Sequence, residues 1–106
     1  MIPRINRLPS TKILSSHIVT TPIFTLRFTK NNLSYPRFAF VISKRIDKRA
    51  VMRNRLKRVL REIAYEEMLK KNQGADLLFI VRKNFIDMPR NVIEQTINQA
   101  LQQIKL

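Results

Sequence analysis

The 106-residue sequence contains no cysteine and no tryptophan, and it has a single histidine, His17, and a single glycine, Gly74. Without cysteine, neither a disulfide nor a thiolate metal site can form. A lone histidine cannot build a multi-histidine metal cluster, so we expect His17 at the surface or in a turn. One glycine and five prolines also argue against a disordered or low-complexity chain.

Long apolar runs are absent as well. No stretch approaches the ~20 apolar residues that a membrane span requires, and the first residues lack the apolar segment of a secretory signal. We therefore expect a cytoplasmic protein without membrane contact. The 44% of hydrophobic residues suffices for a small core, and we expect residues 1–106 to form a single domain, since domains commonly hold about 100–150 residues.

Acidic residues are scarce: 7 Asp and Glu stand against 21 Lys and Arg, which gives a net charge of +14. Net charges of roughly 2–8 suffice for solubility, so this excess predicts a polyanionic partner that relieves the self-repulsion. Nucleic acid is the commonest such partner, because neutralised phosphates release counterions. The acids are scattered along the sequence, which disfavours a stand-alone protein nuclease with carboxylate-bound metal ions.

Three segments have the pattern of β-strands. Residues 23–29 alternate between apolar and polar side chains, as a half-buried strand does, and residues 37–43 predict a second strand. The short link between them favours an antiparallel pair. Residues 76–82 are almost continuously apolar, which is typical of a central strand.

Two segments have the period of helices. Residues 50–70 place apolar side chains on one face, and Asn72 and Gly74 offer a stop. A terminal helix runs to about residue 104, with Asp87 as a plausible N-cap and Pro89 in its first turn. Residues 1–20 fit either a short helical turn or an extended arm. The order β-β-α-β-α, with a possible short N-terminal element, predicts an α+β fold in which a small mixed sheet packs against helices.

The segment 44–61 concentrates the charge. Nine of its 18 residues are Lys or Arg and one, Asp47, is acidic. Arg53, Lys57 and Arg61 repeat at four-residue spacing, where like charges cost a helix roughly 0.2–0.5 kcal/mol per pair. These cations also crowd the end of the helix whose dipole favours anions. Both features oppose helix stability but suit phosphate binding. The predicted RNA-binding residues are Lys44, Arg45, Lys48, Arg49, Arg53, Asn54, Arg55, Lys57, Arg58 and Arg61.

The order of residues within this segment resembles a family signature. Residues 50–62 read Ala-Val-Met-Arg-Asn-Arg-Leu-Lys-Arg-Val-Leu-Arg-Glu, and Ser-Lys-Arg precedes them at 43–45. The most specific part is Arg-Asn-Arg followed by an apolar residue and Lys-Arg. Together with the apolar strand at 76–82, residues 22–104 resemble the bacterial ribonuclease P protein family.

The resemblance implies a function. In that family the RNA subunit carries the active site and its Mg²⁺ ions, and the enzyme removes the 5′ leader of precursor tRNA. The protein would then be a monomer, one per holoenzyme, with no catalytic residue and no organic cofactor of its own. Its partners would be the catalytic RNA and precursor tRNA. The resemblance also implies a left-handed β-α-β crossover and a leader groove on the open face of the sheet, for which the candidates are Thr25, Arg27, Lys30, Ala39 and Val41.

The sequence departs from the family where the leader would bind. Family members usually carry a Phe-x-x-x-Phe-like pair in a first helix, but residues 8–22 contain no Phe, Tyr or Trp. Arg27 stands where a tyrosine is frequent, which predicts a leader contact that is either weaker or more electrostatic, through Arg27 and Lys30. The remaining alternatives are a structural ribosomal-type RNA-binding protein, which the same composition allows, and a membrane-surface or calmodulin-type amphipathic helix.

Overall fold

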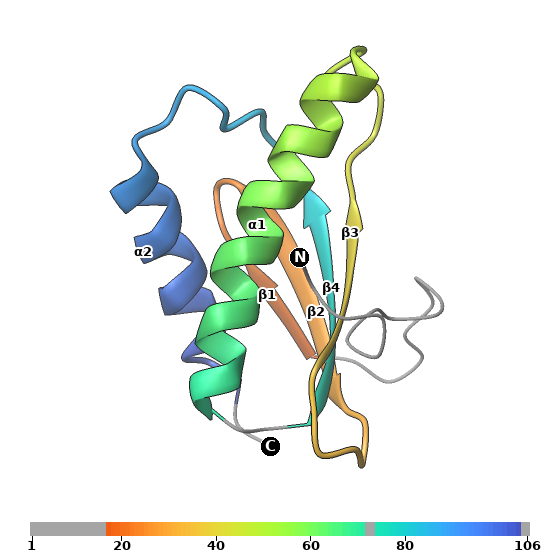
Figure 1. The fold of residues 1–106 in the computed structure, drawn as a ribbon, viewed down its shortest axis with the longest axis vertical. Coiled ribbons are helices and arrows are strands. Elements are labelled where there is room, and N and C mark those ends of the chain that lie inside the picture. The colour runs from red at the N-terminus through yellow and green to blue at the C-terminus, as the bar shows by residue number, and fades with distance from the viewer. Residues whose placement is uncertain (1–16, 72–73, 105–106) are drawn as a thin grey trace.

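The computed structural model describes residues 17–71 and 74–104 of the chain. Four strands and two helices follow one another along the sequence (Figure 1). They are β1 (His17–Thr20), β2 (Phe24–Lys30), β3 (Arg37–Val41), α1 (Ala50–Lys71), β4 (Ala75–Val81) and α2 (Arg90–Leu101). The predicted α+β fold, with a small mixed sheet packed against helices, is confirmed.

The strands form one sheet in the order β1-β2-β4-β3. β4 is therefore a central strand, as its apolar sequence predicts, and it pairs antiparallel with β2 and parallel with β3. The predicted pairing of the second and third strands with each other is wrong, because β4 lies between them. Because β4 pairs with β2 on one side and with β3 on the other, none of its backbone lies at an edge of the sheet.

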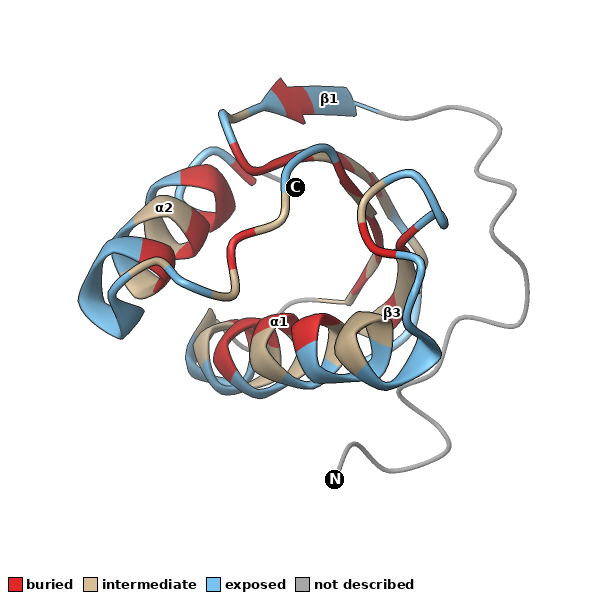
Figure 2. Cartoon of the chain, turned by 90° about the horizontal axis from the view of Figure 1, so that it is seen from above, coloured by how far each residue is buried: buried red, intermediate tan, exposed pale blue. Residues whose placement is uncertain are grey.

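One face of the sheet forms the core. Phe24, Leu26 and Phe28 of β2 lie opposite Val81, Phe79 and Leu77 of β4 in the ladder, and all six are buried. In Figure 2 the buried sides of α1 and α2 are turned toward this face. The alternation of β2 thus separates a helix-covered face from an opposite face, called the open face below because no described helix covers it, on which Thr25, Arg27 and Thr29 are partly exposed.

The connection from β3 through α1 to β4 has an uncommon hand. In Figure 1, β3 runs upward at the right, α1 returns downward in front of the sheet, and β4 runs upward to the left of β3. This sense is left-handed, whereas about 98% of such crossovers are right-handed. The crossover places the N-terminal half of α1 at the end of the sheet where β3 and β4 finish.

The helix α2 differs from the sequence prediction at both ends, and at its C-terminal end it stops at Leu101 and not near residue 104. Asp87 is not the N-cap of α2: the helix begins at Arg90 and its cap is Pro89, whose carbonyl accepts from the N–H groups of Val92 and Ile93. The backbone of the residue before a proline is pushed away from the helical region, so the helix cannot start two residues earlier.

Only a glycine fits at position 74, for a steric reason. α1 ends at Lys71, in agreement with the predicted stop, although Asn72 lies outside the described residues. A Cβ at Gly74 would collide with the backbone carbonyl of Leu33 in the β2–β3 loop. Close approach of two backbones, rather than a positive φ, therefore requires glycine here.

Of the N-terminal segment, residues 17–20 are extended and pair with β2, while residues 1–16 lie outside the described part. His17 is exposed, as expected, and its ring lies 5.3 Å from that of Phe28.

Candidate nucleic-acid interface

The predicted RNA-binding residues lie on the surface. α1 buries the stripe Leu56, Leu60, Ile63, Ala64 and Met68. Asn54, Arg55 and Arg58 project from the opposite side and are exposed, and Arg53, Lys57 and Arg61 flank them with partial exposure. The four cations of residues 44–49, which form the loop between β3 and α1, are also exposed. We call this loop and the N-terminal half of α1 the cationic surface.

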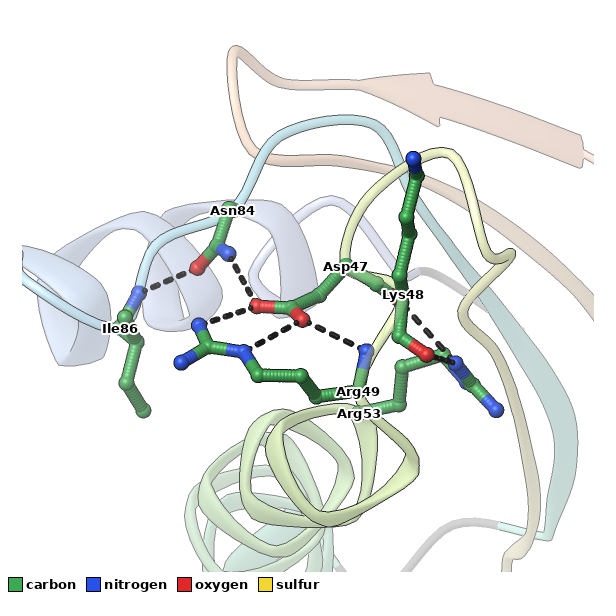
Figure 3. A network of polar contacts seen from close by, with 6 residues as sticks. All are labelled: Asp47, Lys48, Arg49, Arg53, Asn84 and Ile86. Carbon is green, nitrogen blue, oxygen red and sulfur yellow. Dashed lines mark hydrogen bonds and ion pairs between the residues drawn. The ribbon is translucent and has the colours of Figure 1, made fainter.

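Asp47 is the one acidic residue within this surface, and its carboxylate is buried among donors (Figure 3). Arg49 donates to it three times: Nε and the backbone N–H reach Oδ1 at 3.0 and 2.9 Å, and an Nη reaches Oδ2 at 2.9 Å. Asn84 Nδ2 adds a fourth bond to Oδ2 at 3.1 Å. These bonds, those from the Arg49 side chain above all, lower the pKa of Asp47 from 3.8 to about 2.

The contact with Asn84 joins two loops that are distant in sequence. Asn84 lies between β4 and α2, 37 residues from Asp47. Its Oδ1 accepts from the N–H of Ile86 at 3.1 Å, so its amide is held in place from its own loop (Figure 3). The sequence prediction missed both side chains. A lone acid in a run of cations was the available signal for Asp47, but nothing in the sequence pairs it with Asn84.

Arg53 also supports the loop. One Nη of its guanidinium donates to the backbone carbonyls of Asp47 and Lys48, at 3.0 and 2.9 Å. Arg53 therefore has a structural contact in addition to its place on the cationic surface. Arg55 differs, because its guanidinium forms no hydrogen bond or ion pair with any residue in the described ranges and its side chain is exposed.

Arg61 lies at the margin of the cationic surface. Its guanidinium carbon is 6.0 Å from the centre of the Phe40 ring, at the distance of a cation–π contact. Phe40 in turn stacks on Phe79 of the central strand, with ring centres 5.3 Å apart. This contact holds the third turn of α1 against β3.

Two further cations lie beside the Asp47–Asn84 contact. Arg82 and Lys83 directly follow β4, precede Asn84 and are exposed. Their backbone N–H groups donate to the carbonyl of Ile23, at 2.8 and 3.2 Å, which fixes this end of the chain against the start of β2. The sequence prediction did not include them, because they are 33 or more residues from the cationic loop along the chain.

The open face of the sheet gathers four of the five predicted leader residues. Thr25 and Val41 flank Ile80, and Arg27 and Ala39 flank Leu78, in two neighbouring rows of the ladder. Lys30 does not join them, because its position in β2 has the parity of the core-facing residues. The next row holds an ion pair in which the guanidinium of Arg37 binds both carboxylate oxygens of Asp76 at 2.8 Å, which raises the pKa of Arg37.

Acidic side chains collect elsewhere. Glu66 and Glu67 of α1 and Glu94 of α2 line a cleft of about 210 Å³ between the two helices, together with Asn98 and with Lys70, which pairs with Glu67. Within residues 17–71 and 74–104, no three His, Asp or Glu side chains lie close enough to hold a metal ion. The same part of the chain contains no helix with the length and apolar character that crossing a membrane requires.

This combination of fold and charge has known counterparts. The family model described as Ribonuclease P matches residues 13–105. The chain belongs to the ribonuclease P protein family. A family member from Fusobacterium nucleatum, named ribonuclease P protein component, is 35% identical over 83 residues, which cover 74% of each chain.

Solved structures of the family have the same fold. The ribonuclease P protein of Thermotoga maritima aligns with a TM-score of 0.76 at 26% identity, over 85% of this chain and 87% of that one. The Staphylococcus aureus protein aligns with a TM-score of 0.67 at 26% identity, over 82% of this chain and 79% of that one. Family membership separates the chain from the ribosomal-type proteins that its composition also allowed.

Proposed function

We propose that this chain is the protein subunit of a ribonuclease P holoenzyme and binds the catalytic RNA through the cationic surface. The observation that carries the proposal is the concentration of cations at one end of the molecule, where nine Lys and Arg of residues 44–61 meet the N-terminus of α1. Their side chains and the helix dipole point positive charge at the same place. Such contacts position a protein on RNA without selecting a sequence.

The 5′ leader of precursor tRNA is proposed to cross the open face of the sheet. Thr25, Arg27, Ala39 and Val41 lie together there, beside Ile80 and the buried Leu78. The face therefore combines apolar surface for bases with a cation for phosphate. The same holoenzyme would act in the cytoplasm.

The protein would contribute binding, and the RNA would hold the Mg²⁺ ions. Mg²⁺ prefers carboxylate and phosphate oxygens, and the described residues do not group carboxylates for it. We therefore propose no catalytic residue in this chain and no organic cofactor. A monomer, one per holoenzyme, suffices for both binding surfaces.

A cleavage assay tests this function. Precursor tRNA is incubated at low Mg²⁺ with a bacterial ribonuclease P RNA, with and without the protein. The protein is expected to stimulate cleavage at the 5′ end of the mature tRNA, and the Arg55→Ala, Arg58→Ala double variant is expected to stimulate less. The matched control is Lys70→Ala, Lys71→Ala, which removes the same charge from the far end of α1.

Two outcomes would contradict the proposal. Failure of the wild-type chain to stimulate the RNA would remove the holoenzyme role. Cleavage by the protein without any RNA would place the active site in the protein.

A further inference from the structure

We propose that Asp47 is a positioning residue for RNA binding: its buried carboxylate fixes the loop of residues 44–49 against the β4–α2 loop, so that the cations meet RNA in a preset arrangement. This inference rests on the RNA-binding function proposed above. It assigns a binding role to a negative charge, which electrostatics alone would count against binding to a polyanion.

The carboxylate holds three parts of the surface at once. Its bond from the backbone N–H of Arg49 forms a tight turn immediately before α1. Its two bonds from the Arg49 side chain are a two-point contact with a planar guanidinium, a geometry that restricts both partners. Its bond from Asn84 ties this turn to the loop after the central strand.

The backbone of the loop is fixed by a second contact. One Nη of Arg53, in the first turn of α1, donates to the carbonyls of both Asp47 and Lys48, and this connects the start of the helix to the loop as well. Lys48 and Arg45 are exposed and lie on either side of Asp47 in the sequence. The network therefore determines where these two cations project.

The physical benefit of such a network is a lower cost of ordering. A cationic loop repels itself when free, and ordering it on RNA costs roughly 0.5–1.5 kcal/mol per immobilised long side chain, or about 2- to 12-fold in affinity. A buried carboxylate that orders the loop beforehand removes part of that cost. Asp47 is 9% exposed, so it is shielded from the phosphates that its charge would repel.

The decisive experiment compares two carboxyl-to-amide substitutions. Asp47→Asn and Asp87→Asn each raise the net charge by one, and Asp87 is an exposed acid of the β4–α2 loop that acts on Arg49 only through its charge. Affinity for an in vitro transcribed bacterial ribonuclease P RNA is measured over a series of salt concentrations. Asp47→Asn is expected to weaken binding roughly three- to tenfold, whereas Asp87→Asn should leave it unchanged or strengthen it.

A second variant, which leaves the net charge unchanged, separates the loss of the loop contact from a general loss of folding. Asn84→Ala removes the bond between the loops without changing the net charge, and it should weaken binding in the same direction with a salt slope close to that of the wild type. Amide exchange separates loop order from global stability. The N–H of Arg49 should exchange faster in Asn84→Ala, while that of Leu78 in the central strand should keep its protection.

The outcomes are distinct. If Asp47→Asn strengthens binding as much as Asp87→Asn does, the carboxylate only masks Arg49 and the positioning role is wrong. If both Asp47→Asn and Asn84→Ala bind as the wild type does, the loop needs no fixing and the role is equally wrong. If the wild-type chain itself fails to bind the RNA, the proposed function fails first and this inference with it.

Discussion

At the scale of single residues, cations of the same surface differ in what they already bind. Arg53 donates to two backbone carbonyls and Arg49 pairs with Asp47, whereas the guanidinium of Arg55 is exposed and has no bonding partner within the described ranges. Removing a guanidinium that supports the fold therefore affects both stability and binding. Removing one that projects into solvent affects only its contact with a partner.

Arg55→Ala and Arg53→Ala should therefore differ. Arg55→Ala is expected to change the free energy of unfolding by less than about 0.5 kcal/mol and to flatten the log–log salt dependence of RNA binding by up to about one unit. Arg53→Ala should also lower stability by about 1 kcal/mol, because its bonds to the loop carbonyls are lost. Urea denaturation and binding titrations measure the two quantities. Equal stability of the two variants would contradict the structural part assigned to Arg53.

Arg27 and Lys30 offer a matched pair on one strand, because β2 turns them to opposite faces. Arg27→Ala is expected to lower the affinity for leader-bearing precursor tRNA roughly two- to fivefold, a typical effect of one phosphate contact. Leaderless tRNA should bind as before, and Lys30→Ala should spare the preference for the leader. Competition between leader-bearing and leaderless tRNA measures this preference. An unchanged preference in Arg27→Ala would remove the open face from leader binding.

At the scale of elements, the link between the β3–α1 and β4–α2 loops depends on an ionised carboxylate. The pKa of Asp47 is lowered to about 2 in the folded chain from 3.8. A lowered pKa contributes stability that is fully present above the unfolded value and is lost as the pH falls through the folded one. The link should thus stabilise the fold from about pH 4 upward and weaken between about pH 4 and 2.

Acid titration of stability tests this. The thermal midpoint of the wild type is expected to exceed that of Asp47→Asn by a margin that is constant from pH 7 to about 5 and shrinks between about pH 4 and 2. Circular dichroism at a series of pH values follows both proteins. A margin that does not depend on pH down to 2 would mean that the carboxylate charge contributes nothing to the link.

The central strand is the second element with a clear expectation. Phe79 is fully buried and contacts the rings of Phe24 and Phe40, at 5.1 and 5.3 Å between centres. Phe79→Ala should lower the free energy of unfolding by about 3–5 kcal/mol. Ile80→Ala, on the open face of the same strand, should cost about half of that or less. Urea unfolding compares them, and similar losses would contradict the assignment of the two faces.

At the scale of the whole molecule, positive and negative side chains are concentrated in different places. The cationic surface lies where β3 and β4 finish, while Glu66, Glu67 and Glu94 line the cleft between the helices. With a net charge of +14, this division gives the molecule a preferred orientation as it approaches RNA.

Binding to RNA should accordingly depend steeply on salt. If about four of the nine cations in residues 44–61 neutralise phosphates, raising the salt concentration from about 50 to 200 mM should weaken binding roughly 50- to 150-fold. Filter binding with ribonuclease P RNA gives this number. A loss of less than about tenfold would show that the cationic surface makes few phosphate contacts.

The sequence by itself determined both helices and three of the four strands, and it showed that α1 is cationic; β1 alone was left open between a helical turn and an extended arm. The sequence patterns that predicted them are local: the alternation in residues 23–29, the apolar run at 76–82 and the helical period of 50–70. They arise because side chains turn toward the core with a period of 2 in a strand and 3.6 in a helix. The charge excess and its position at the start of α1 are equally local, and they were enough to place the candidate binding residues on one surface.

Only the tertiary structure decided which distant residues meet. The insertion of β4 between β2 and β3 depends on how all the apolar faces pack together, and a short link alone pointed to the wrong pair. The same packing brings Asn84 to Asp47 across 37 residues. Such contacts leave no periodic pattern in the sequence, since they depend on the path of the whole chain. For that reason the acid at the centre of the cationic surface gained its role only from the fold.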